Sequence, residues 1–235
     1  MKISSRILIR VSCVMGAFAL IACAGGSVRN QTAARREIEQ RLRDQPTPAV
    51  LFIGNSYSFG APRAFKKIAA ERGRSITVDQ ATRKGWSLAR HANNRETLEK
   101  IHERHWDIVV LQEYSELPSQ PLKRNVTMFP SIVRLSDELR RQGSIPVLYQ
   151  TWAYRAGDPK KTGDDFKAMN KRVREGYNIA AQNAGGLFIV PVGDGWEREV
   201  SAGHASLLFM PDGKHPTPRG NELTARVFAD CLLPK

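Results

Sequence analysis

The sequence predicts a single α/β domain in which a mostly parallel sheet of about five strands lies between layers of helices. Short apolar runs, typical of strands buried on both faces, alternate with longer amphipathic patterns that are typical of helices. This alternation favours right-handed crossover connections and therefore a parallel sheet. Polar residues that can take part in catalysis or hydrogen bonding follow several predicted strands, at the edge where open parallel sheets bind ligands.

The strands are predicted from five apolar runs, of which the second is the weakest, at residues 49–53, 76–78, 108–111, 145–149 and 187–190. Helices are predicted after them, starting near Pro62, over residues 95–105, 129–141 and 165–183, and from Thr217 and Pro218 onward. The sequence contains no internal repeat and no sign of a second domain. Residues 49–235 are therefore expected to fold as one unit.

The N-terminus has the pattern of an export signal. Three basic residues precede an apolar stretch over residues 11–22, which is too short to span a bilayer comfortably. Residues 20–23, Leu-Ile-Ala-Cys, resemble the bacterial lipobox, in which the cysteine is acylated and becomes the first mature residue. We therefore expect a signal peptide over residues 1–22 and an exported protein anchored by lipid at Cys23 to the periplasmic or cell-surface side of a bacterial membrane. An ordinary signal peptide is the alternative.

Residues 23–48 are expected to form the lipidated N-terminus and a tether. The stretch is polar and rich in charged residues, and it ends in Pro46-Thr47-Pro48. Part of it has a composition compatible with a helix.

The chain is strongly basic. Its formal net charge of +13 falls to +10 when the three basic residues of the signal are removed. Basic pairs are scattered along the sequence and are not gathered into one run with aromatic residues. The charge therefore favours anionic surroundings, such as a membrane surface, and not a nucleic-acid partner. No pattern predicts an oligomeric state.

A serine, a histidine and an aspartate predict a catalytic triad. Ser56 follows the first apolar run and so lies at the carboxyl end of a predicted strand. A serine hydroxyl attacks an ester only when an imidazole takes its proton and a third group orients that imidazole. Asp212 precedes His215 by three residues, a spacing that lets the carboxylate reach Nδ1 and leaves Nε2 for the serine. Asp194, after the last predicted strand, is an alternative carboxylate.

These features resemble the SGNH hydrolases, relatives of the GDSL esterases, in a bacterial branch with a Gly-Asn-Ser first block. The family places a nucleophilic serine after its first strand and an Asp-x-x-His pair near the C-terminus, matching Ser56, Asp212 and His215. The resemblance implies a flavodoxin-like three-layer sandwich and a carboxylic ester hydrolase without a cofactor. It extends from residue 50 to residue 228 and includes further blocks at residues 85–88, 106–113, 151–153 and 190–193.

The chain departs from the family at the block that supplies an oxyanion-binding asparagine. The usual Gly-x-Asn-Asp is absent, and Gln112 at the end of a predicted strand is the nearest substitute. The resemblance therefore implies an oxyanion hole made by the backbone N–H groups of Ser56 and Gly85 together with the Gln112 side-chain amide.

Four further residues are expected beside the substrate pocket because they follow predicted strand ends or belong to the glycine block at residues 85–88: Asn55, Trp86, Trp152 and Tyr154. For the three aromatic side chains, burial in the core is an equal alternative. No metal site is predicted, because His102 and His105 lack the H-E-x-x-H order and a third ligand nearby.

Two functions from different classes follow. The first is a hydrolase of small acyl esters, above all O-acetyl groups on carbohydrate, since the resembling families include many carbohydrate esterases and the chain carries an export signal. The second is a non-catalytic or acyl-transferring envelope protein that binds glycans with the same fold. The missing asparagine block favours the second function. The serine, histidine and aspartate in their expected positions favour the first, and we give them more weight.

Overall fold

A five-stranded parallel sheet forms the centre of the protein. The computed structural model describes residues 31–233. The sheet has the order β2-β1-β3-β4-β5, and every pairing is parallel, so the predicted flavodoxin-like sandwich is confirmed. The strands are β1 (Ala49–Gly54), β2 (Thr77–Thr82), β3 (Ile108–Leu111), β4 (Ile145–Tyr149) and β5 (Phe188–Val190). The weakest sequence pattern belongs to β2, which is an edge strand and is only half-buried.

Five of the longer helices follow the strands as the sequence predicted, whereas α8 and several short helices in the loops were not predicted. The longer helices are α2 (Ala61–Glu71), α4 (Arg95–His102), α6 (Phe129–Arg141), α7 (Phe166–Asn183), α8 (Val192–Ser201) and α10 (Pro218–Leu232). The short ones are η1 (Ser56–Ser58), α3 (Leu88–His91), η2 (Leu117–Ser119), α5 (Pro121–Lys123), the π-helix η3 (Arg124–Met128) and α9 (Ala205–Leu208).

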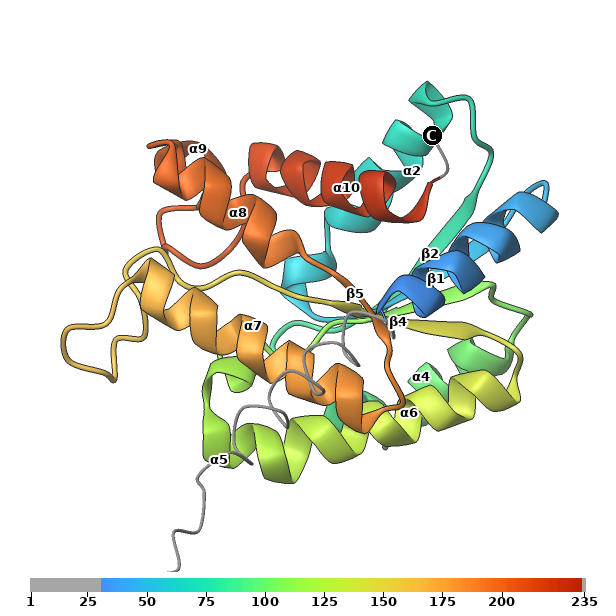
Figure 1. Cartoon of the computed structure of the whole chain (residues 1–235), viewed down its shortest axis with the longest axis horizontal. Helices are drawn as coiled ribbons and strands as arrows, with labels where there is room; N and C mark the ends of the chain where they lie inside the picture. The colour runs from blue at the N-terminus through green and yellow to red at the C-terminus, as the bar shows by residue number, and fades with distance from the viewer. Residues whose placement is uncertain (1–30, 234–235) are drawn as a thin grey trace, which may run out of the picture.

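Alternating side chains of the central strands build two apolar cores. On β1, Val50 and Phe52 pack with α2, α8 and α10, whereas Leu51 and Ile53 pack with α3, α4, α6 and α7. The two helical layers lie above and below the sheet in Figure 1. Each fully buried aliphatic or aromatic side chain contributes about 1.5–3 kcal/mol to stability, and burial on both faces explains why these strands are continuous apolar runs.

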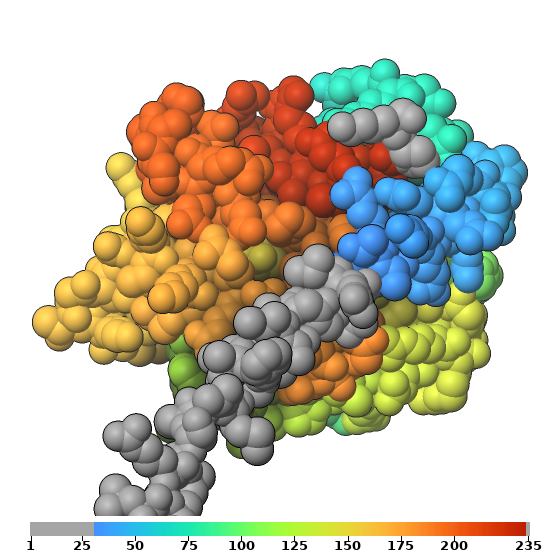
Figure 2. All heavy atoms as spheres, in the orientation of Figure 1, coloured from blue at the N-terminus to red at the C-terminus, as the bar shows by residue number. Residues whose placement is uncertain are grey.

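A helix over residues 31–44 covers the amino-terminal edge of the sheet. Its Ile38 and Leu42 are buried in the core. Arg41 donates to the carbonyl of Gly143, just before β4, at 3.0 Å. In Figure 2 this segment, in blue, lies between the red C-terminal helix and the yellow-green α6. The sequence assigned the stretch to a tether, but from residue 31 onward its apolar side chains make it part of the packed domain.

The carboxyl ends of the strands form the opposite edge and carry the loops that contain the candidate site residues. No helix within residues 31–233 is long and apolar enough to cross a membrane.

Candidate active site

The nucleophile candidate lies in a tight turn directly after β1. Asn55 caps the short helix η1, because its side-chain oxygen accepts the N–H of Tyr57 at 3.1 Å. This cap places Ser56 at the first position of η1, where its side chain is half-buried. The Ser56 Oγ lies 2.9 Å from Nε2 of His215, within hydrogen-bond distance.

The histidine is oriented by the aspartate three residues before it. Asp212 Oδ2 lies 2.5 Å from His215 Nδ1, and Asp212 Oδ1 accepts the backbone N–H groups of Lys214 and His215 at 2.9 and 3.0 Å. Gly213 has a φ of +66°, a left-handed conformation that lets the chain fold back on itself here. The sequence-predicted residues Ser56, His215 and Asp212 are therefore brought together in one hydrogen-bonded chain.

The protonation pattern of this chain suits general-base chemistry. Partial desolvation raises the pKa of the Asp212 carboxyl. Hydrogen bonds from the His215 side chain and from two backbone N–H groups together have the larger, opposite effect, so the pKa is lowered to about 2. An ionised Asp212 keeps a proton on Nδ1 of His215, so the lone pair of Nε2 faces the serine hydroxyl.

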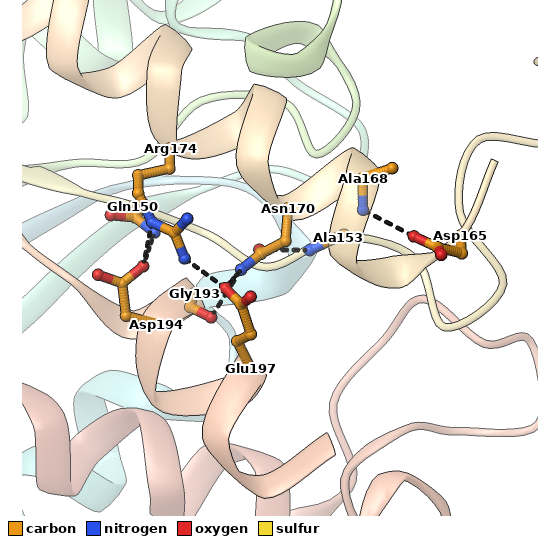
Figure 3. A network of polar contacts seen from close by, with 9 residues as sticks. All are labelled: Gln150, Ala153, Asp165, Ala168, Asn170, Arg174, Gly193, Asp194 and Glu197. Atoms are coloured by element: carbon orange, nitrogen blue, oxygen red, sulfur yellow. Dashed lines mark hydrogen bonds and ion pairs between the residues drawn. The ribbon is translucent and has the colours of Figure 1, made fainter. Parts of the chain in front are cut away.

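Asp194, the alternative carboxylate, is not beside the histidine. It accepts hydrogen bonds from Gln150 and Arg174, both at 2.8 Å. Figure 3 shows this ion pair within a larger network in which Arg174 also contacts Glu197 and Asn170 bridges to the backbone of Ala153 and Gly193. The network fixes the segment after β4 to the start of α8 and to α7.

The Gln112 side-chain amide is hydrogen-bonded to the turn that carries Ser56. Its Oε1 accepts the Asn55 N–H at 2.9 Å and the Ser58 hydroxyl at 3.0 Å, and its Nε2 donates to Asn55 Oδ1 at 3.1 Å and to the Glu113 carbonyl. The orientation of the amide is determined because the backbone N–H of Asn55 can only donate. Both amide hydrogens are occupied, which contradicts the expectation that Gln112 donates to an oxyanion. Gln112 instead holds Asn55 in place.

The backbone N–H groups of Ser56 and Gly85 are the other expected oxyanion donors. Neither group has a hydrogen-bond acceptor among residues 31–233. Gly85 occupies a left-handed position with φ of +70° in a turn closed by the Trp86 N–H. The Asn55 side chain donates to the Trp86 carbonyl at 2.9 Å, so this turn is tied to the residue before the serine.

Three of the four expected pocket residues are buried in the core. Asn55, Trp152 and Tyr154 are exposed by 4% or less, so they are packing and positioning residues and do not wall a pocket. Trp86 differs, because its side chain is half-exposed beside the turn around Gly85, the glycine turn. It is the member of the expected set that a substrate can reach.

Trp152 has a positioning role that its sequence pattern did not indicate. Its indole stacks between the rings of Tyr57 and Trp196, with centroids 4.5 and 3.8 Å away and interplanar angles of 3° and 5°. Its Nε1–H donates to the Lys214 carbonyl at 3.0 Å. Since Tyr57 follows the serine and Lys214 precedes the histidine, Trp152 connects the two loops that form the catalytic chain.

The two histidines of the apparent metal pattern serve other roles. His102 pairs with Glu138 at 3.0 Å, and His105 lies 3.6 Å from Asp107. Within the described range, no group of three or more His, Cys, Asp or Glu side chains is arranged to hold a metal ion.

Glu113 is a buried carboxyl beside Gln112. Its Oε1 accepts the N–H groups of Leu88, at the start of α3, and of Tyr114. Its Oε2 is buried and has no partner in the described part of the chain. Burial raises the pKa of Glu113 to about 7, and the two backbone N–H groups oppose that rise. The acidic residue two positions after the end of the buried strand β3 was the available sequence signal.

The raised pKa of Glu113 predicts a pH-dependent stability. The folded protein binds this proton more tightly than the unfolded chain does, so the contribution of Glu113 to stability is fully present below its ordinary pKa of 4.5 and is lost as the pH rises toward 7. The loss amounts to roughly 3 kcal/mol. Glu113→Gln keeps the Oε1 acceptor and should flatten the dependence of melting temperature on pH between 5 and 8. An equally steep dependence in the variant would assign the effect to another group.

Comparison with known proteins identifies the family. No protein-family model and no curated protein matches the sequence. A solved structure from Slackia heliotrinireducens, described as a candidate SGNH hydrolase, is 31% identical, with 79% of this chain and 98% of that chain covered and a TM-score of 0.64. The chain therefore belongs to the SGNH hydrolase family, whose fold and relatives define a hydrolase of the ester-cleaving type.

More distant structures share the fold. A DUF4886 family protein from Bacteroides uniformis is 20% identical, with 80% of this chain and 83% of that chain covered and a TM-score of 0.68. A variant of an acetyl-xylooligosaccharide esterase from Geobacillus is 14% identical, with 80% and 95% covered and a TM-score of 0.61.

Proposed function

We propose that this protein is a serine hydrolase that cleaves small acyl esters, most of all O-acetyl groups on carbohydrate. The observation that carries the proposal is the hydrogen-bonded chain from Ser56 through His215 to Asp212. Two structural relatives, described as an acetyl-xylooligosaccharide esterase and an acetyl xylan esterase, support the carbohydrate ester as substrate class. The alternative is a glycan-binding or acyl-transferring protein on the same fold.

The proposed reaction proceeds in two steps. His215 Nε2 takes the proton of Ser56 as Oγ attacks the ester carbonyl, and the backbone N–H groups of Ser56 and Gly85 donate to the resulting oxyanion. Protonated His215 gives its proton to the leaving alcohol, which departs and leaves an acyl-serine. Water, deprotonated by His215, then attacks the acyl group and restores Ser56, releasing the carboxylic acid.

An ester panel on the purified protein and on Ser56→Ala tests this function. The panel contains acetyl, butyryl and octanoyl esters and O-acetylated sugars, with and without a free sugar as acyl acceptor. We expect short acyl esters to be hydrolysed and Ser56→Ala to be inactive. Acyl transfer to the free sugar in preference to water would favour the transferase alternative, and no Ser56-dependent turnover on any ester would favour the binding protein.

We further propose that the protein is an exported lipoprotein of the bacterial branch marked by Gly54-Asn55-Ser56. Residues 1–30, which include Cys23, lie outside the described residues. The described chain begins with Gln31, whose side chain bonds the backbone of Leu187 and Ile189 at the amino-terminal edge of the sheet. The candidate site lies at the opposite edge, where the strands end.

The lipobox predicts that the mature protein begins at acylated Cys23 and partitions with membranes. Cys23→Ser is expected to block processing or to release the protein, because the thioether-linked lipid supplies the membrane affinity. Cell fractionation and intact-mass analysis of the membrane-extracted protein measure both effects. An unmodified Cys23, or cleavage at another position, rules the anchor out.

A further inference from the structure

The segment that contains the glycine turn carries unpaired positive charge. Residues 80–95 include four basic residues and no acidic residue. Two of them, Arg83 and Arg95, form ion pairs with glutamates of α4. The guanidinium of Arg90 has no ion-pair or hydrogen-bond partner in the part of the chain that the structure describes, and it lies over the Trp86 ring, 6.0 Å from the ring centroid. This arginine can therefore pair with an external anion.

An open hollow lies beside Arg90. It has a volume of about 550 Å³ and is lined by Trp86, Ala89, Arg90, Asn93 and Asn94. Arg134 from α6 donates to Asn93 Oδ1 at 2.7 Å and brings a second guanidinium to the rim. Its size and its mixture of one aromatic ring, amides and guanidinium groups suit a small polar ring that carries negative charge.

Trp86 differs from the other three tryptophans in its hydrogen bonding. The indole N–H groups of the others donate within the protein, to the carbonyls of Lys100 and Lys214 and to the Thr224 hydroxyl. The indole N–H of Trp86 has no acceptor among the described residues. Trp86 therefore offers a half-exposed aromatic ring and a free donor to a ligand.

The hollow is linked through Trp86 to the residue before the nucleophile. The Asn55 side chain donates to the Trp86 carbonyl at 2.9 Å, and Asn55 is the residue before Ser56. A group bound against Trp86 thus lies on the same side of the site as the glycine turn. We place the alcohol part of an ester substrate on this side of the reacting carbonyl.

We infer that this hollow is a subsite for an anionic sugar residue in the alcohol part of the substrate, an inference that rests on the proposed esterase function. The apolar face of the sugar ring packs on Trp86, and the sugar carboxylate accepts hydrogen bonds from the Arg90 guanidinium. The indole N–H of Trp86 donates to a ring hydroxyl. Arg90 is then the residue that selects acidic over neutral sugars.

A matched pair of substrates tests the inference. O-acetylated methyl glucuronoside and O-acetylated methyl glucoside differ in one carboxylate, and we expect wild type to favour the acidic ester by about tenfold in kcat/KM, the size of one charge-assisted hydrogen bond. In Arg90→Gln this ratio should fall toward one. Arg63→Gln, which removes an exposed charge on α2 in the other helical layer, should keep the ratio. Equal kcat/KM for the two esters in wild type, or an unchanged ratio in Arg90→Gln, overturns the subsite.

A binding measurement separates this inference from the proposed catalysis. Ser56→Ala is titrated with the unacetylated methyl glucuronoside or methyl glucoside while the indole N–H resonance of Trp86, identified by its loss in Trp86→Phe, is followed by NMR. The acidic sugar should shift this resonance at lower concentration than the neutral one, and Arg90→Gln should abolish the difference. If no ester is hydrolysed but this preference is present, the subsite stands and the esterase proposal fails. Absence of the preference refutes the subsite.

Discussion

Ser56→Ala and His215→Ala are each expected to lower ester turnover by about a millionfold, because each removes one end of a chain that acts as a unit. Ser56 loses the attacking oxygen, and His215 loses the base that lies 2.9 Å from it. Both side chains are partly exposed, so the folded state loses little when they are shortened. The measurement is kcat on an acetyl ester, with melting temperature as the check on folding.

Two further variants sharpen this prediction. The Ser56→Ala, His215→Ala double variant should be scarcely slower than either single one. Asp212→Asn keeps an oxygen for the backbone N–H groups of Lys214 and His215 but loses the carboxylate that holds the proton on Nδ1, and should cost about ten-thousandfold in kcat. Additive losses in the double variant, or fluorophosphonate labelling at a residue other than Ser56, would show that the nucleophile has been wrongly assigned.

The sheet and the Asp212–His215 contact were predictable because each depends on local sequence, whereas the pairing of Ser56 with His215 joins distant residues and was expected from the family resemblance. Strands buried on both faces of a parallel sheet must be apolar runs, and the sequence around β1, β3 and β4 shows them plainly. The Asp212–His215 contact lies within one turn of the chain, so its spacing alone indicated it. The position of Ser56 followed from the end of β1.

The roles of Gln112 and Trp152 were not predictable, because their partners are distant in the sequence. The Gln112 amide is oriented by the backbone of Asn55 on the neighbouring strand end, a contact set by the β1–β3 register. Trp152 follows a strand end, where an aromatic side chain serves equally well as a pocket wall or as core. Its ring stacks on Trp196 of α8, and Trp152 is therefore a core residue. The burial of Ile38 likewise depends on a sheet edge formed by other segments.

Gln112→Glu is expected to damage stability and turnover together. The carboxylate oxygen that replaces Nε2 would face two acceptors, Asn55 Oδ1 and the Glu113 carbonyl, inside a core where Gln112 is fully buried. A buried polar group without its partner costs about 1–3 kcal/mol, and more when it is charged. A loss of roughly 3 kcal/mol corresponds to about 10 °C in melting temperature for a domain of this size. The freed Asn55 no longer fixes the turn of Ser56, so kcat falls as well.

The pH dependence of the same variant distinguishes two roles of Gln112, positioning Asn55 and donating to the oxyanion. Protonation lets the new carboxyl donate to one of the two acceptors, so its pKa should be raised in the folded state and the deficit in melting temperature relative to wild type should widen from pH 5 to pH 8. Ser58→Ala is the matched control, because it removes one bond to Gln112 Oε1 and leaves both contacts with Asn55. It should cost about 1 kcal/mol and little kcat. A Gln112→Glu protein with the melting temperature of wild type but a hundredfold lower kcat would return the Gln112 amide to the oxyanion hole.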